Sequence, residues 1–164
     1  KADAYALERA RKHNIPALVL DHKQYPNRQA YDTALVALLR QHGVNLVVLA
    51  GFMRLLSPIM IEAFPNAIMN IHPALLPAFP GLDAQKQAFD YGVRYTGCTV
   101  HFVDSGTDTG PIILQAVVPI LGDDTLESLT QRIHSEEHRI YVEAVHLFCA
   151  GRLQINGRKV SIHE

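Results

Sequence analysis

The sequence predicts an α/β fold with a largely parallel sheet and flanking helices. Short apolar runs alternate along the chain with longer segments in which apolar residues recur every three or four positions. This alternation is typical of strands that are joined by crossover helices. The runs are continuously apolar, as in strands that helices cover on both faces.

The composition supports one folded domain over residues 1–164, because 48% of the residues are hydrophobic and only 19% are charged. The formal net charge is -1, from 15 Lys and Arg against 16 Asp and Glu, so no overall charge favours nucleic acid or an anionic membrane. No apolar stretch reaches the ~20 residues that a membrane helix needs. Cys98 and Cys149 are expected to be reduced core thiols of a cytoplasmic protein.

The first half of the chain is expected to hold two helices and three strands. Ala2–His13 is rich in helix-forming residues, and Asn27–His42 has apolar residues at helical spacing with a glycine after it. Ala17–Leu20 is a short apolar run after a proline and is interpreted as a strand. Asn45–Ala50 and Ala67–His72 are continuous apolar runs, typical of buried strands.

The second half is expected to contain two helices, two long strands and a terminal hairpin. Asp83–Tyr91 is interpreted as a helix that ends at a glycine, and Asp124–Ala150 as a long helix. The β-rich runs Tyr95–Asp104 and Pro111–Ile120 are joined by a short turn-forming segment. An Asn-Gly pair between the two halves of Leu153–Ile162 indicates a hairpin turn.

Two polar residues interrupt the strand that precedes the proline-rich loop 73–82. Asn70 and His72 are two positions apart, so both point to one face of the strand, while Met69 and Ile71 point to the other. In open α/β sheets, ligands bind at the carboxyl ends of the strands. The alternative is a pair of polar side chains that close the strand and bond to the following loop.

Asp108 lies in the loop Ser105–Pro111. A carboxylate next to His72 would favour the protonated imidazole, and such pairs perform general acid–base catalysis. Asp, Thr and Gly are also ordinary turn formers, so a solvent-exposed turn is the alternative.

Glu137 lies within the apolar stripe of the long predicted helix, four residues after Ile133 and three before Ile140. A carboxylate on an inner face must be paired or must face a ligand. The alternative is that the helix emerges into solvent at this point.

Known motif patterns give no metal site and no nucleotide-cofactor site. His134 and His138 fit the H-x-x-E-H zinc-peptidase pattern, but Glu143 is poorly spaced to serve as a further ligand, so no metal is expected. The glycines form neither a dinucleotide-binding fingerprint nor a P-loop.

Three segments carry a resemblance to a known family: Met69–Pro77 (MNIHPALLP), Gly97–Val103 (GCTVHFV) and Asp108–Ile113 (DTGPII). In this order they resemble the formyltransferases that use 10-formyltetrahydrofolate, and the resemblance extends over nearly the whole chain. It implies a Rossmann-like formyltransferase fold and formyl transfer to the amino group of glycinamide ribonucleotide in purine synthesis. A related deformylase, which uses water as the acceptor, and a non-catalytic folate-binding fragment are the alternatives.

The resemblance implies a role for each matched residue. Asn70, His72 and Asp108 match the catalytic residues of the family. The folate pocket matches a larger set, which comprises Arg28, Met53, Arg54, Leu55, Leu56 and Asn70. Glu137 matches a residue that contacts the ribose of the nucleotide substrate. Simple packing of Met53–Leu56 and a solvated Arg28 are the alternatives.

The resemblance also bears on cofactors and partners. No permanently bound cofactor is implied, because 10-formyltetrahydrofolate is a cosubstrate that the reaction consumes. The expected partners are small molecules, without nucleic acid or membrane, and the expected state is a monomer or homodimer in the cytoplasm. From the resemblance we expect that the domain lacks an N-terminal segment of the family before Lys1, with its first strand and Gly-rich phosphate loop. Asp83-Ala84-Gln85 stands where members of the family often carry a histidine.

Overall fold

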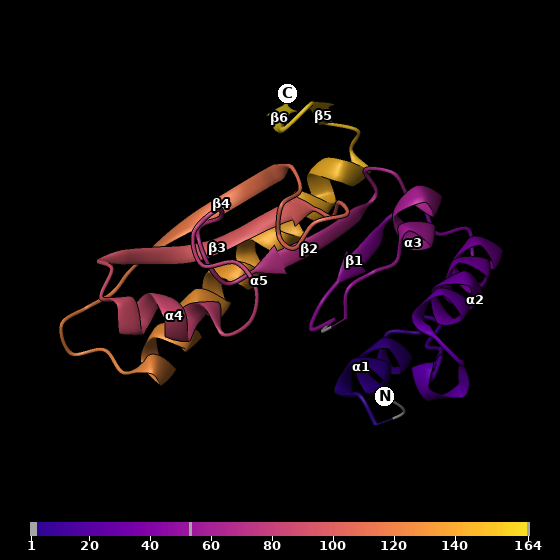
Figure 1. The fold of residues 1–164 in the computed structure, drawn as a ribbon, viewed down its shortest axis with the longest axis horizontal. Helices are drawn as coiled ribbons and strands as arrows, with labels where there is room; N and C mark the ends of the chain where they lie inside the picture. The colour runs from indigo at the N-terminus through magenta and orange to yellow at the C-terminus, as the bar shows by residue number, and fades with distance from the viewer. Residues whose placement is uncertain (1–2, 53, 164) are drawn as a thin grey trace. The chain divides into compact units, whose positions relative to one another are not determined.

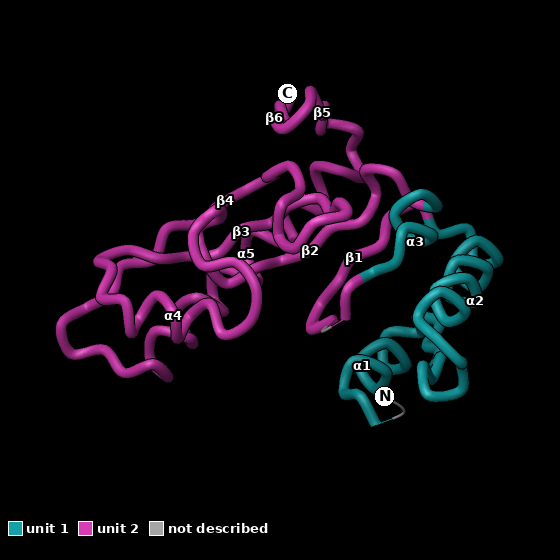
Figure 2. Tube along the Cα trace, viewed as in Figure 1, with its two compact units in different colours: residues 1–44, 56–63 teal, residues 45–55, 64–164 magenta. Residues whose placement is uncertain are grey.

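A computed structural model of the chain describes residues 3–52 and 54–163. The chain divides into two compact units, one of residues 1–44 and 56–63 and the other of residues 45–55 and 64–164 (Figure 2). The predicted catalytic residues all belong to the second unit.

The first unit is helical in the structure. Its elements are α1 (Tyr5–Lys12), the 3-10 helix η1 (His22–Gln24), α2 (Arg28–Gln41) and α3 (Pro58–Ala63). The strand predicted at Ala17–Leu20 is wrong, because this segment pairs with no strand among the residues described, and Leu18 and Val19 are exposed. An apolar run forms a strand only where a neighbouring strand supplies hydrogen bonds, and the run itself cannot reveal that neighbour.

Side-chain hydrogen bonds lie at the start of two of these helices. The Asn27 Oδ1 accepts a hydrogen bond of 2.8 Å from the Ala30 amide, which starts α2 where the sequence predicts a helix. The buried Asp32 carboxylate accepts one of 2.7 Å from the amide of Ser57, directly before α3. Helix α3 was not predicted, since six residues are too few to show a helical period.

The second unit is built on a sheet with the strand order β1-β2-β3-β4-β6-β5. The strands are β1 (Val47–Leu49), β2 (Ile68–His72), β3 (Tyr95–Phe102), β4 (Ile112–Pro119), β5 (Leu153–Asn156) and β6 (Lys159–Ile162). The α/β class with flanking helices is confirmed, as is the terminal hairpin of β5 and β6.

Strand direction varies across this sheet. β1 runs parallel to β2, and β4 runs parallel to β6, whereas β3 runs antiparallel to both β2 and β4. At β3 the sheet departs from the predicted parallel arrangement. The short connection from β3 to β4 explains the antiparallel pairing of these two strands, since parallel neighbours need a crossover of about a dozen residues or more.

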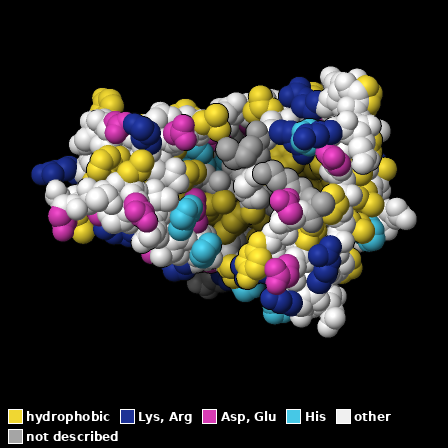
Figure 3. Space-filling view, turned by 90° about the horizontal axis from the view of Figure 1, so that it is seen from below, with side chains coloured by type: hydrophobic (Ala, Val, Ile, Leu, Met, Phe, Trp, Pro, Cys, Tyr) yellow, Lys and Arg dark blue, Asp and Glu magenta, His cyan; other side chains and the backbone are white. Residues whose placement is uncertain are grey.

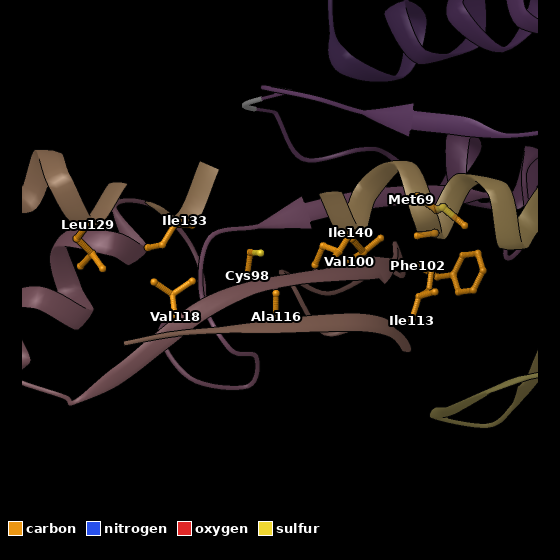
Figure 4. Close-up of a cluster of buried hydrophobic side chains, with 11 residues drawn as sticks. Met69, Cys98, Val100, Phe102, Ile113, Ala116, Val118, Leu129, Ile133 and Ile140 are labelled. Atoms are coloured by element: carbon orange, nitrogen blue, oxygen red, sulfur yellow. The ribbon is translucent and has the colours of Figure 1, made fainter. Parts of the chain in front are cut away.

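Two helices accompany this sheet, α4 (Ala84–Tyr91) and α5 (Leu126–Cys149), and α5 runs along β3 and β4 (Figure 1). The core between α5 and the sheet includes Cys98, Val100, Phe102, Leu129, Ile133 and Ile140 (Figure 4). Burial raises the pKa of the Cys98 thiol to about 12, with the Glu137 carboxylate adding to the shift. Cys149, in contrast, is exposed at the end of α5, so its predicted core position is wrong.

The start of α5 is held by reciprocal hydrogen bonds. The Thr125 hydroxyl accepts from the Ser128 amide at 3.2 Å, and the Ser128 hydroxyl accepts from the Thr125 amide at 3.0 Å. Next to this cap, both carboxylate oxygens of Asp124 accept from the Arg132 guanidinium, at 2.7 and 2.8 Å. These bonds hold the pKa of the Asp124 carboxyl well below its usual range.

Tyr141 connects α5 with the first two strands of the sheet. Its hydroxyl lies 2.7 Å from the carbonyl oxygen of Leu49 and 2.9 Å from that of Met69. Burial raises the pKa of the Tyr141 hydroxyl, so it stays a hydrogen-bond donor.

The surface carries charges of both signs. Lys and Arg side chains are interspersed with Asp and Glu over the face drawn in Figure 3. None of the helices in the described ranges has both the length and the apolar character that crossing a membrane requires.

Candidate active site

Five polar side chains share one face of strands β2, β3 and β4. Asn70 lies opposite His101 in the register, and His72 lies opposite Thr99, which in turn lies opposite Gln115. Because side chains alternate along a strand, these residues point away from the core that packs on α5. The prediction that Asn70 and His72 share a face is confirmed.

His72 is buried, and both of its ring nitrogens have partners. Its Nε2 lies 2.8 Å from the carbonyl oxygen of Phe79, in the loop that follows β2. A carbonyl only accepts hydrogen bonds, so Nε2 carries a proton and donates it. The Nδ1 atom lies 3.4 Å from Asp108 Oδ2, and the side chains are 4% and 14% exposed. The structure therefore brings together the imidazole and the carboxylate that the sequence could only propose as a pair.

Asp108 is held by its backbone conformation and by a second hydrogen bond. The Gly81 amide donates to Asp108 Oδ2 at 2.8 Å. Asp108 itself has a φ of 55°, in the left-handed region that Asp tolerates better than most residues. Nearby Gly110 packs so closely that an added Cβ would lie 1.7 Å from the Phe102 carbonyl oxygen. Asp108 thus belongs to a constrained loop and not to a free solvent turn.

His101 is a member of the site that was not predicted from the sequence. Its Nδ1 lies 2.8 Å from the Phe102 carbonyl oxygen and so donates to it, which leaves Nε2 as the acceptor 3.3 Å from Asn70 Nδ2. Burial lowers the pKa of the His101 imidazole, which keeps the ring neutral. Its Nε2 also lies 3.7 Å from Asp108 Oδ1. A polar residue inside the apolar run of β3 was the available signal.

The residues predicted to bind folate are described only in part. Arg54 packs over the ring of Phe52, with the guanidinium carbon 5.0 Å from the ring centroid, and Leu55 is 61% exposed. Arg28 is exposed at the start of α2, and it belongs with Leu56 to the first unit. Met53 lies outside the described residues. The folate role of these residues stays a prediction.

Glu137 is paired, as a carboxylate on an inner helix face must be. Its Oε2 lies 2.5 Å from His134 Nδ1, and the Glu137 side chain is only 12% exposed. His134 thus has a carboxylate partner on its own helix. Within residues 3–52 and 54–163, no three His, Cys, Asp or Glu side chains gather closely enough to hold a metal ion.

An amide, a buried imidazole and a carboxylate thus converge at one face of a mixed sheet. These are the catalytic groups of an α/β enzyme that transfers an acyl group. Comparison with known families agrees with this class, because the formyl transferase family matches residues 1–145. The chain belongs to the formyl transferase family.

Similar proteins are known both as sequences and as structures. The crystal structure of glycinamide ribonucleotide transformylase 1 from Symbiobacterium toebii superposes with a TM-score of 0.97 at 59% identity, over 100% of this chain and 77% of that one. Phosphoribosylglycinamide formyltransferase of Bacillus subtilis is 48% identical over 145 residues, which are 88% of this chain and 74% of that protein. The trifunctional purine biosynthetic protein adenosine-3 of Chironomus tentans is 47% identical over 96% of this chain, which spans only 12% of that protein.

Proposed function

We propose that this protein transfers the formyl group of 10-formyltetrahydrofolate to the amino group of glycinamide ribonucleotide, a step of purine synthesis. The observation that carries the proposal is the contact of the buried His72 with Asp108, beside Asn70. The names of the relatives above support formyl transfer to glycinamide ribonucleotide, and the resemblance of the sequence motifs supports 10-formyltetrahydrofolate as the donor.

Asn70 stabilises the oxyanion in the proposed reaction. Attack of the amine on the formyl carbon forms a tetrahedral intermediate, whose oxygen bears negative charge. The Asn70 amide has two N–H groups, and His101 Nε2 accepts only one of them. The other is available to donate to the oxyanion, an interaction typically worth about 10²–10³ in turnover.

His72 moves the proton in the proposed reaction. The leaving N10 nitrogen needs a proton, and the attacking amine must lose one. The imidazole gives a proton to N10 and takes one back from the new amide nitrogen. The Asp108 carboxylate, 3.4 Å from Nδ1, stabilises the positive charge of the ring when both nitrogens are protonated.

The remaining assignments belong to the same proposal. Arg28 and the segment Met53–Leu56 bind the folate, with Arg28 near the carboxylates of its tail. Glu137 binds the ribose of the nucleotide substrate. The protein acts as one domain in the cytoplasm, as a monomer or homodimer, with no resident cofactor.

The test follows consumption of the formyl donor by absorbance, with and without glycinamide ribonucleotide. Consumption that depends on the ribonucleotide, with the formylated product identified by mass spectrometry, is the expected result. Release of free formate without the amine would instead identify a deformylase. Binding of a folate analogue without any turnover would identify a non-catalytic folate-binding protein. Either of these two outcomes overturns the proposal.

A further inference from the structure

The loop that follows β2 supplies one partner to each member of the His72–Asp108 pair. Its Phe79 carbonyl accepts from His72 Nε2, and its Gly81 amide donates to Asp108 Oδ2, both at 2.8 Å. The position of the loop therefore sets the orientation of the imidazole and of the carboxylate. Whatever holds the loop against the sheet acts on both groups.

Thr99 holds the first part of this loop. The Thr99 hydroxyl donates to the Ala74 carbonyl at 2.7 Å and accepts from the Leu76 amide at 3.1 Å. Thr99 is fully buried and lies opposite His72 in the β2–β3 register. The hydroxyl has one proton to donate and two lone pairs, so these bonds leave one lone pair free.

Gln115 completes this set of hydrogen bonds from the next strand. Its Nε2 lies 3.0 Å from Thr99 Oγ1 and 3.0 Å from the Leu76 carbonyl oxygen. The amide nitrogen has two protons, one for each acceptor, and the hydroxyl of Thr99 is then fully bonded. Gln115 lies opposite Thr99 in the β3–β4 register, so the strand pairing itself places the amide there.

We propose that Gln115 is a positioning residue for formyl transfer, and this inference rests on the function proposed above. The Gln115 amide fixes Leu76 and Thr99, these fix the loop, and the loop orients His72 through the Phe79 carbonyl. Loss of the amide leaves the Leu76 carbonyl without this donor and lets the loop shift. Displacement of a catalytic group by about 1 Å can cost about 10²-fold in rate.

The first test measures turnover in Gln115→Met, which keeps the length of the side chain and removes the amide. We expect kcat to fall about 10-fold with KM for both substrates within about two-fold, because positioning affects the chemical step more than binding. Val117→Thr is the matched control, since Val117 is the next residue on the same face of β4 and is 62% exposed. The control should keep the kcat of the unaltered protein. An unchanged kcat in Gln115→Met would overturn the proposal.

A double-mutant cycle with His72→Ala separates positioning from a general structural effect. If Gln115 acts through His72, its replacement should matter less than two-fold once the imidazole is gone. An equal loss in both backgrounds would show that Gln115 does not act through His72.

A third readout does not depend on turnover. In protein with ¹⁵N-labelled histidine, the Nε2 proton of His72 should give a nuclear magnetic resonance signal that is slow to exchange, because it is bonded to Phe79. We expect Gln115→Met to shift or broaden this signal and Val117→Thr to preserve it. An unchanged signal in Gln115→Met overturns the positioning role. Absence of formyl transfer by the unaltered protein would overturn the proposed function alone.

Discussion

At the scale of single residues, the site contains two imidazoles in different electrostatic surroundings. His101 lies farther from the Asp108 carboxylate and is kept neutral by burial, which lowers its pKa. His72 has its Nδ1 beside the same carboxylate, where a positive charge is stabilised. The two rings are therefore suited to different work, with His101 as an acceptor that orients Asn70 and His72 as the group that moves a proton.

The first prediction concerns His72. Replacement of His72 by Ala should lower kcat by about 10²-fold or more, since proton transfer by a positioned side chain is worth about 10²–10⁴. The affinity for a folate analogue, measured by calorimetric titration, should change little. His163→Ala, at an exposed position near the end of the chain, serves as the control. Turnover close to normal in His72→Ala would contradict the assignment.

The second prediction concerns the charge of Asp108. Asn also tolerates the left-handed backbone found at this position, so Asp108→Asn removes the charge with little backbone strain. The carboxylate beside Nδ1 of His72 is then replaced by a neutral amide, which does not stabilise a positive charge on the ring. We therefore expect kcat to fall, measured as consumption of the formyl donor at a fixed pH. The exposed Asp123→Asn is the control, and an unchanged kcat in Asp108→Asn would show that Asp108 is only a turn residue.

At the scale of the elements, long periodic segments could be predicted and short unpaired ones could not. Helix α2 follows its apolar spacing, and Asn27 caps it. The run Ala17–Leu20 has the composition of a strand but no strand beside it among the described residues. The antiparallel pairing of β3 with β4 follows from their short connection, whereas the antiparallel pairing of β3 with β2 is not revealed by the alternation of strands and helices.

The candidate site could be predicted to the extent that it lies on one strand. The two-residue spacing of Asn70 and His72 is enough to place both on one face. The contacts of Asn70 and His72 with Asp108 and His101 could not be predicted from spacing. Asp108 and His101 are 29 or more positions away along the chain and meet the pair only through folding. The resemblance to the family supplied Asp108 as a catalytic residue, whereas the role of His101 emerged from the register of β2 and β3.

The cap of α5 gives a prediction at this scale. Thr125→Ala removes the acceptor for the Ser128 amide, and loss of such a cap costs about 1 kcal/mol of unfolding free energy. Urea denaturation followed by circular dichroism measures the change. Ser135→Ala, on the exposed side of the same helix, should leave stability within about 0.5 kcal/mol. Equal stability of Thr125→Ala and the unaltered protein would show that the cap is not needed.

At the scale of the whole molecule, burial of His101 makes stability depend on pH. The pKa of this imidazole is lowered on folding from its ordinary value of 6.5, so below that pH the unfolded chain binds more protons than the folded one. The contribution of His101 to stability is therefore full above pH 6.5 and declines as the pH falls toward the lowered pKa.

The measurement is the unfolding free energy at pH 7.5 and at pH 5.5, in the unaltered protein and in His101→Gln. Glutamine does not titrate, so the variant should lose less stability between the two pH values. The other histidines contribute equally to both proteins and cancel in the difference. The same loss in both proteins would contradict the prediction.

The bonds of Tyr141 have a consequence for the cooperativity of the second unit. A single hydroxyl meets backbone carbonyls of β1 and β2, so a fluctuation that lifts α5 from the sheet must break these bonds at once. Opening of the helix near Tyr141 and fraying of β1 then become one event. In native-state hydrogen exchange, the amides of β1 and of residues 137–145 should show a common protection, and Tyr141→Phe should let β1 exchange faster than the helix.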